Sequence, residues 1–242
     1  MRPDAKQIYA VIEGTWPAAS QHIAGPWMIR EGRGGGSRVS AATARQPVTA
    51  DELPLAENAM RDLGQTPLFM IREDDKNLDA LLAERGYDIF DPVNIYLAPV
   101  AEMATKRPPP VTCFTIWEPL EIMADIWNVG GINAGRQAVM QRAPGPKTAL
   151  FGRSNNRPAA AGFIAIHQGI AMVHALEVLP RHRRAGMGRY MMHQAAFWAL
   201  DHGATHISCV CRQKNPAANR LYASLGMTLV GQYHYRKEGM TA

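Results

Sequence analysis

Apolar and polar residues in the second half of the chain switch between helical and strand periodicity. Over residues 119–128, apolar side chains recur at helical spacing, whereas 159–166 and 170–179 are aliphatic runs bounded by turn residues. Asn-Pro, Gly-Gly and single glycines separate the segments. The elements predicted in order are helices at 119–128 and 133–142, strands at 149–152, 159–166 and 170–179, a helix at 188–199, a strand at 206–212, a helix from 215 to 226, and one or two strands over 228–237.

This order begins as an antiparallel meander and ends as alternating helix and strand. Helices that follow the meander have to cover its faces. The pattern therefore predicts an α/β (α+β) fold with a mixed central sheet flanked by helices.

The first half of the chain shows a weaker version of the alternating helices and strands that end the second half. A helix at 56–63, a strand at 67–72, a helix at 77–85 and a strand at 89–97 are predicted. Arg72 and Gly86 are 14 residues apart, as are Arg212 and Gly226. We interpret the equal spacing as a diverged internal duplication. Coincidence between two ordinary strand–helix units is the open alternative.

Three successive prolines, Pro108 to Pro110, interrupt helix and strand patterns and favour a stiff linker. The charge changes sign nearby. Residues 1–105 hold 10 Lys and Arg against 15 Asp and Glu, whereas residues 106–242 hold 16 against 6. We predict a domain at 1–105, a Pro-rich linker at 106–112 and a second domain at 113–242.

The composition of the 242 residues, 47% hydrophobic and 19% charged, is typical of a globular protein. No apolar run is long enough for a membrane helix, and the first residues lack an apolar signal core. Three cysteines do not form a disulfide framework, so we expect a cytoplasmic protein. The basic half suits a polyanion, either nucleic acid or a phosphorylated cofactor, or it is simply a solvated surface.

The segment from Leu176 to Arg189 carries the strongest chemical signal. A strand runs into an arginine-rich turn with two glycines, Gly186 and Gly188, and a helix begins at once. Free N–H groups and the positive end of a helix dipole suit a phosphate or pyrophosphate. Met191 stands where a dinucleotide-binding turn needs a third glycine, and no Gly-Lys-Ser/Thr of a P-loop is present.

A second motif follows on the next predicted helix. Asn215 suits the N-cap, Pro216 the first helical position and Gly226 the position just after the helix. Ala218 and Tyr222 share a face with Asn215, because the three are spaced at i, i+3 and i+7. The small side chain between two polar ones leaves room for a ligand along that face. An ordinary packed helix with a core tyrosine is the alternative.

Together, the two motifs resemble the GNAT family, the Gcn5-related N-acetyltransferases. Arg183-x-x-Gly186-x-Gly188 resembles the turn that binds the pyrophosphate of acetyl-CoA in that family. The helix from Asn215 to Met227 resembles the family's Asn-x-x-Ala-x-x-x-Tyr-x-x-x-Gly-Phe motif, with Met227 in place of Phe. The resemblance covers residues 113–242 and implies a GNAT fold there, with residues 1–105 as a degenerate copy lacking the cofactor turn. The cofactor-binding residues it implies are Val178, Arg183, Arg184, Gly186, Met187, Gly188, Arg189, Asn215, Ala218 and Tyr222.

Acetylation of an amine requires a base, a donor that polarises the thioester and an acid for the thiolate. By resemblance, the Val178 N–H polarises the carbonyl and Tyr222 protonates the sulfur. Glu177 is the only acidic residue between Asp125 and Asp201, and we predict it as the base; a structural ion pair is its alternative. His174 is a rival base, but regular strand alternation places it on the opposite face from Glu177.

The resemblance thus implies an acetyl-CoA-dependent N-acetyltransferase that moves an acetyl group to a primary amine by direct attack in a ternary complex. The acceptor would be a small molecule or a peptide, and an acidic first half would attract a cationic amine. A non-catalytic acyl-CoA-binding or sensing protein is the alternative. We expect no metal, since Cys209 and Cys211 suit core packing, and no nucleic-acid or membrane partner. The strand at 228–237 could add to a partner's sheet, but nothing indicates an oligomer.

Overall fold

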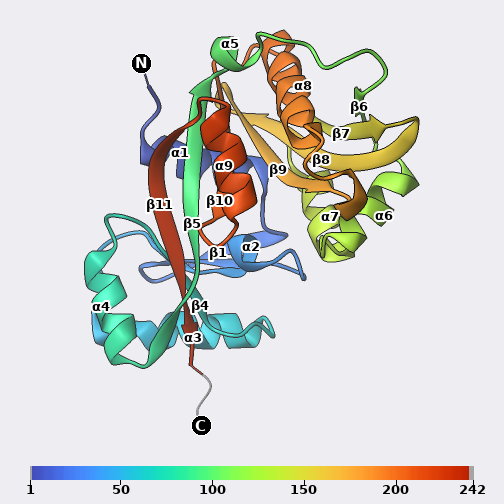
Figure 1. The fold of residues 1–242 in the computed structure, drawn as a ribbon. Helices are drawn as coiled ribbons and strands as arrows, with labels where there is room; N and C mark the ends of the chain where they lie inside the picture. The colour runs from blue at the N-terminus through green and yellow to red at the C-terminus, as the bar shows by residue number, and fades with distance from the viewer. Residues whose placement is uncertain (1, 240–242) are drawn as a thin grey trace. The chain divides into compact units, whose positions relative to one another are not determined.

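The computed structural model describes residues 2–239, and its second half follows the predicted order of elements. Each predicted helix and strand there is present, and residues 228–238 form one strand (Figure 1). Two short elements, α5 and β6, were not predicted. The elements are α5 (Val100–Met103), β6 (Cys113–Ile116), α6 (Glu121–Val129), α7 (Ala134–Arg142), β7 (Lys147–Ser154), β8 (Arg157–His167), β9 (Ile170–Val178), the 3₁₀ turn η2 (Pro180–His182), α8 (Met187–Asp201), β10 (His206–Arg212), α9 (Pro216–Ser224) and β11 (Thr228–Glu238).

The first half contains the four predicted elements and several more near the N-terminus. The predicted ones are α3, β4, α4 and β5. Among the others, α1 begins with a capping box in which Asp4 and Gln7 satisfy each other's backbone N–H groups. The elements are α1 (Ala5–Thr15), β1 (Ser20–Ala24), β2 (Trp27–Glu31), α2 (Ser37–Ser40), β3 (Thr43–Ala44), the 3₁₀ turn η1 (Ala50–Glu52), α3 (Leu53–Asp62), β4 (Leu68–Ile71), α4 (Lys76–Glu84) and β5 (Tyr87–Pro99).

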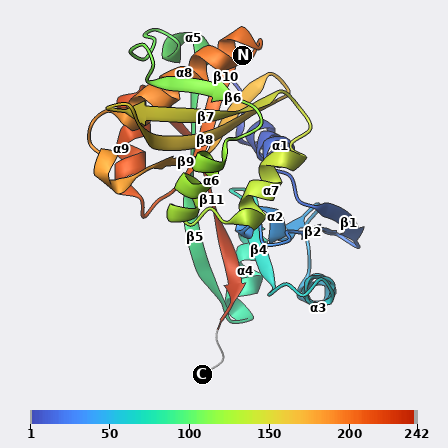
Figure 2. The same ribbon diagram turned by 90° about the vertical axis from the view of Figure 1, so that its right-hand side faces the viewer.

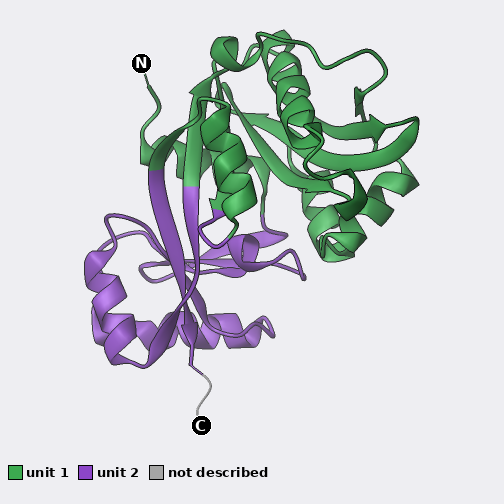
Figure 3. Cartoon of the chain, viewed as in Figure 1, with its two compact units in different colours: residues 1–17, 95–211, 215–230 green, residues 18–94, 212–214, 231–242 purple. Residues whose placement is uncertain are grey.

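The chain forms two compact units whose boundaries differ from the predicted ones (Figure 3). The larger unit comprises Met1–Pro17, Ile95–Cys211 and Asn215–Val230. The smaller unit comprises Ala18–Asn94, Arg212–Lys214 and Gly231–Ala242. The Pro-rich segment 106–112 therefore lies within the larger unit rather than between two domains. The physical reason is long-range pairing: α1 packs on β8 and β9, and the end of β11 pairs with β4.

The larger unit is built on a mixed sheet, as predicted. Its strand order is β11-β5-β10-β9-β8-β7-β6. The pairs β6–β7, β7–β8 and β8–β9 are antiparallel, and β9–β10 is parallel. Strand β11 has β5 as its neighbour on one side, and on the other side β4 pairs with its residues His234 to Lys237.

Helices cover both faces of this sheet. Helix α8 packs on β6 to β9 through Met191, Met192 and Ala195, which are fully buried. Helices α1 and α6 pack on β8 and β9, and α6 lies on the side away from α8 (Figure 2). Among residues 2–239, none of the helices combines the length and the apolar character that a membrane span requires.

The smaller unit has its own sheets and core. Strands β1, β2 and β3 form an antiparallel sheet, and β4 pairs antiparallel with β11. An isolated parallel bridge joins Ala42 to Phe69. The core gathers large apolar side chains from β2, β4, α3 and α4, including Trp27, Phe69, Met60 and Leu82.

The order of elements repeats in the two halves of the chain. Three antiparallel strands are followed by helix, strand, helix and strand in β7 to β11. The same order occurs in β1 to β5, apart from the short α2 between β2 and β3. The third and fourth strands pair in parallel in the second half, and the bridge at Ala42 has the same sense in the first. The duplication stays a prediction, and this repeat of order and sense supports it.

Glu57 on α3 anchors the smaller unit through a buried carboxylate. It accepts two hydrogen bonds from the Arg85 guanidinium, at 2.6 and 2.8 Å, and one from the Tyr87 hydroxyl at 2.9 Å. The hydrogen bond from Arg85 is the main cause that lowers the pKa of Glu57, and it outweighs burial, which raises that pKa. The carboxylate therefore stabilises the fold in its ionised form.

We predict that Glu57→Gln lowers the free energy of unfolding at pH 7 by about 1–2 kcal/mol. Because the folded-state pKa is lowered, the wild-type advantage is complete above the unfolded-state value of about 4 and is lost as the pH falls further. Urea unfolding at pH 7 and below pH 4 measures this. Glu84→Gln on the exposed face of α4 is the control and should cost nothing; an equal loss in both variants would contradict the prediction.

Candidate active site

Strands β9 and β10 are hydrogen-bonded over only part of their length. The parallel pairing runs from Ile170 opposite His206 to Val173 opposite Cys209, and both strands continue for several residues. Within the described residues, no pairing between the two strands lies beyond this point. The end of β9 therefore has an edge that β10 does not cover, where backbone groups can face a ligand.

A β-bulge at Ala175 shifts the register of β9. Ala175 has a φ of +51°, and the pairing with β8 is irregular at this position. His174 lies opposite Phe163, and Glu177 lies opposite Ala161. Phe163 and Ala161 are two residues apart and point to the same face, so their partners His174 and Glu177 do so as well.

The bulge makes the expectation that His174 and Glu177 lie on opposite faces wrong. That expectation rested on a regular strand, and one extra residue reverses the alternation. Before the bulge, Val173 packs into the core beneath α8, and after it Leu176 and Val178 do so. His174 and Glu177 are left on the face covered by α1 and α6.

Trp127 on α6 holds the bulge in place. Its indole Nε1 donates a hydrogen bond of 2.9 Å to the carbonyl oxygen of Ala175, and the side chain is buried. A carbonyl turned out of the sheet ladder needs a partner when it is buried. The indole supplies that partner.

Glu177 lies half-buried at the end of β9. The Arg183 Nη2 donates to its Oε1 at 2.8 Å. The ion pair considered as an alternative for Glu177 is therefore present. On its other side the carboxyl contacts Gly130 at the end of α6, where a Cβ would lie 2.6 Å from Cγ and 2.7 Å from Oε2 of Glu177. Only glycine leaves room for the carboxylate there.

His174 is held deep in the fold. Its side chain is 3% exposed, and its ring lies 4.9 Å from that of Trp16. The Thr15 hydroxyl donates its single proton to the carbonyl of Val11, so His174 Nε2, 2.8 Å away, donates to the Thr15 oxygen. This packing favours a structural role for His174 over a role as the catalytic base.

The turn between β9 and α8 fits an anion. Arg184 and Gly186 both have positive φ, +61° and +80°, and Gly186 is the N-cap of α8. No side chain caps this helix, so the N–H groups of its first turn point out of the N-terminus. With exposed arginines beside them, these groups have the chemistry to hold a phosphate or pyrophosphate.

The predicted cofactor residues on α8 differ in what they offer. Met187 is buried in the core, and a Cβ at Gly188 would lie 3.0 Å from a methyl carbon of Leu221 on α9. Met187 and Gly188 thus offer only their backbone to a ligand. Arg189 turns to α9 and donates to Ser224 Oγ at 2.9 Å. Arg183 bends back instead, and its Nε donates to the Val178 carbonyl at 2.8 Å.

Helix α9 carries the second motif as predicted. Asn215 is the N-cap, and its side chain accepts from the Ala218 N–H at 3.1 Å. Tyr222 is buried beside Cys209 of β10 and 5.5 Å from the ring of Tyr96. Burial, and then the neighbouring Cys209, raise the pKa of Tyr222 well above its usual value, so the hydroxyl keeps its proton. It lies at the point where β9 and β10 separate, because Cys209 is the last paired residue.

The cysteines lie in the core, as expected. Cys209 and Cys211 belong to the cluster beneath α8, and burial raises the pKa of both thiols, that of Cys211 to about 11. Across residues 2–239, no three His, Cys, Asp or Glu side chains are grouped so that they could hold a metal ion.

The sequence did not reveal how four residues shape this site. Trp127, Ala175, Gly130 and Thr15 act through contacts between distant elements. The one available signal for these contacts is Gly130-Gly131, and this pair by itself indicates only the end of a helix. Nothing in the aliphatic run of β9 marks Ala175 as a bulge.

Residues 117–227 match the model of the acetyltransferase (GNAT) family. Over 243 aligned residues, the chain is 24% identical to an uncharacterized N-acetyltransferase, YobR, of Bacillus subtilis (strain 168), covering 96% of this chain and 98% of that protein. The matched region contains both motifs and all of β7 to α9.

Two solved structures have a similar fold. A GCN5-related N-acetyltransferase from Kribbella flavida matches with a TM-score of 0.77 at 21% identity, covering 98% of this chain and 96% of that one. A tandem GNAT protein from the clavulanic acid biosynthesis pathway matches with a TM-score of 0.62 at 14% identity, covering 84% and 76%. At these identities the likeness shows the fold alone.

We predict that Trp127→Phe frees the Ala175 carbonyl and lowers the free energy of unfolding by about 1–3 kcal/mol, because a buried acceptor loses its donor. Amide hydrogen exchange around residues 174–178 should become faster. Trp198→Phe is the matched control, since that buried indole stacks on His202 and lies away from the bulge. If exchange in residues 174–178 is the same in both variants, the indole does not hold the bulge.

Proposed function

The chain is a member of the GNAT family of N-acetyltransferases, and we propose that it moves the acetyl group of acetyl-CoA directly to a primary amine within a ternary complex. Family membership indicates acyl transfer from acetyl-CoA. The observation that carries the finer proposal is the end of β9. There the carboxylate of Glu177 is paired with Arg183, which belongs to the turn that leads into the uncapped N-terminus of α8.

The residues fit the cofactor in the following way. The first turn of α8 and the cradle at Arg184 and Gly186 would hold the pyrophosphate. The uncovered edge of β9 offers the Val178 N–H, and α9 offers the face of Asn215 and Ala218. Acetyl-CoA, when bound, supplies the acetyl group as a thioester.

Glu177 is the base in this proposal. An ammonium cannot attack a carbonyl, so a proton has to leave the amine first. The carboxylate accepts that proton, directly or through a water molecule. Gly130 fixes the carboxylate from one side and Arg183 from the other. Because an anion in the turn competes for the Arg183 guanidinium, cofactor binding would loosen Arg183 from Glu177 and leave the base available.

Tyr222 is the acid in this proposal. Its hydroxyl stays protonated at neutral pH, since burial raises its pKa. It therefore donates a hydrogen bond to the departing thiolate, and a proton where the thiolate is basic enough. Its place beside Cys209, where the strands separate, supports this role.

We predict that Glu177→Gln lowers kcat for acetyl transfer by about a hundredfold and leaves acetyl-CoA binding within a factor of two or so. Thiol release in the presence of a panel of primary amines measures turnover, and calorimetric titration of acetyl-CoA measures binding. Retained turnover would remove Glu177 as the base. Absence of acetyl-CoA binding in the wild type would instead overturn the whole proposal.

A steric variant separates the position of the carboxylate from its chemistry. Gly130→Ala displaces Glu177 without removing it and should lower kcat by about tenfold. Gly131→Ala is the matched control. Its φ of +74° makes alanine strained, yet no atom lies within 4 Å of the new Cβ. We expect it to lose stability but to keep its turnover.

We predict that Tyr222→Phe lowers kcat by about tenfold or more, with a smaller change in KM, since the hydroxyl acts on the leaving group. Replacing the cysteine neighbour, Cys209→Ala, provides the control for packing, because it alters the same buried contact without removing a proton donor. Equal losses in the two variants would assign Tyr222 to the core alone.

A further inference from the structure

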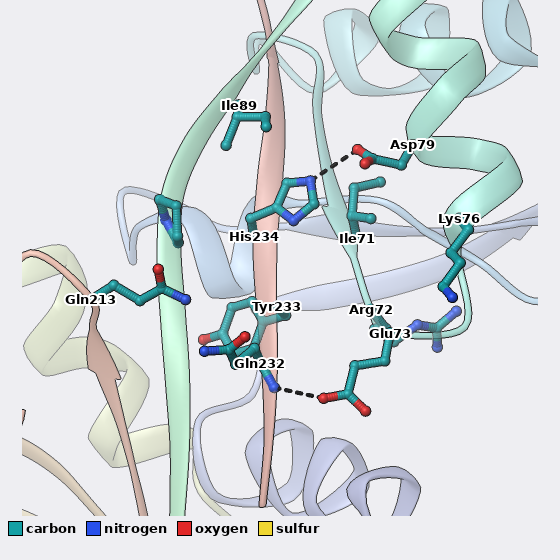
Figure 4. Close-up of a pocket in the computed structure, with 11 residues that line it drawn as sticks. Ile71, Arg72, Glu73, Lys76, Asp79, Ile89, Gln213, Gln232, Tyr233 and His234 are labelled. Carbon is teal, nitrogen blue, oxygen red and sulfur yellow. Dashed lines mark hydrogen bonds and ion pairs between the residues drawn. The ribbon is translucent and has the colours of Figure 1, made fainter. Parts of the chain in front are cut away.

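A pocket of about 330 Å³ lies in the smaller unit, and the site described above uses none of its residues. Its walls come from the β4–α4 turn, from β5, from the loop after β10 and from β11 (Figure 4). It is lined by Ile71, Arg72, Glu73, Lys76, Asp79, Ile89, Pro92, Gln213, Gln232, Tyr233 and His234.

Two of the charged side chains in this pocket are already neutralised by neighbours. Arg72 donates to the carboxylate of Asp75 at 2.8 Å. Asp79 accepts from Arg236 at 2.7 Å and from His234 at 2.9 Å. Burial raises the pKa of Asp79, but the hydrogen bonds from Arg236 and His234 outweigh it, and the pKa is lowered. These groups hold the pocket together and offer a ligand little net charge.

Two other charged side chains in the pocket have opposite signs and no ion pair in the described part of the chain. Glu73 accepts one hydrogen bond, from the Gln232 N–H at 3.0 Å, which leaves most of its carboxylate for a cation (Figure 4). Lys76, at the first position of α4, forms no ion pair with Glu73, although it follows Glu73 by only three positions. The pocket therefore presents one anionic and one cationic group to a ligand.

His234 adds an acceptor. A carboxylate only accepts, so the bond to Asp79 requires the proton on Nε2 of His234. In the neutral ring, Nδ1 is then an acceptor, and no other described residue forms a hydrogen bond to the ring. Asp79 fixes the orientation of the imidazole, so this acceptor is held in place.

We propose that this pocket binds a free α-amino acid with an apolar side chain. An α-ammonium group supplies N–H donors and positive charge for Glu73, and an α-carboxylate pairs with Lys76. Ile71, Ile89 and Pro92 supply apolar surface for the side chain. A phosphate would meet the carboxylate of Glu73, and a plain amine would leave Lys76 unmatched. The inference does not depend on the acyl-transfer proposal.

Ligand-observed NMR or calorimetry on the full chain without acetyl-CoA tests this proposal. The probes are L-valine, L-leucine, L-methionine and L-phenylalanine at millimolar concentration. We expect at least one to bind, and its amide and N-acetyl derivatives to bind about tenfold more weakly, since each lacks one charge. If no probe binds, or if both derivatives bind as well as the parent amino acid, the proposal is wrong.

Variants of the two charged pocket residues test whether the amino acid binds in this pocket. Glu73→Gln keeps an oxygen for the Gln232 N–H, Lys76→Met keeps the aliphatic stem, and each should weaken binding about three- to tenfold. Glu84→Gln, exposed at the far end of α4, should leave binding unchanged. Binding that is lost in Glu177→Gln and kept in the two pocket variants would place the amino acid at the acyl-transfer site instead, and would overturn the proposal.

Discussion

The hydrogen bond from Trp127 to the carbonyl of Ala175 is the constraint on which the candidate site depends. It stabilises a single extra residue in β9. That residue reverses the face of the sheet to which each later side chain of the strand points. Without it, Glu177 would face the core beneath α8, and Val178 would face α6. With it, the one carboxylate on the strand lies on the face of α6, next to the strand edge that β10 does not cover. The base in the proposed mechanism thus owes its position to an indole about 50 residues earlier in the chain.

A second constraint acts at the start of α8. A helix whose first turn is not capped leaves several N–H groups to be satisfied by an anion. The equivalent helix of the first half, α3, begins differently. It follows a capping box of Thr49 and Glu52, and Asp51 adds a further negative charge. The two halves share an order of elements but differ in helix-start chemistry. This contrast supports the prediction that only the second half holds an acyl-CoA, and the separate pocket gives the first half a different proposed ligand.

The residues of the two motifs were predictable because their physics is local. Asn215 caps α9, Gly186 has positive φ at the start of α8, and Tyr222 lies seven residues after Asn215 on the same helix face. The compact units divide elsewhere than at the predicted linker, residues 106–112, for a non-local reason. Charge balance and prolines mark where the chain is stiff, but the units are set by pairing between distant strands. The opposite facing predicted for His174 and Glu177 failed because a bulge has no sequence signature in an aliphatic run.

The sequence by itself determined the kinds of elements, their order in the second half, the mixed sheet and the two motifs of the family. Each of these follows from periodicity, caps and turn residues within about 15 positions of one another. Only the tertiary structure decided which face Glu177 occupies and that Gly130 and Arg183 contact its carboxylate. It also decided that Glu73, Lys76 and His234 line one pocket. These depend on which distant segments pack together, because packing and sheet register are cooperative properties of the whole unit and not of any local window.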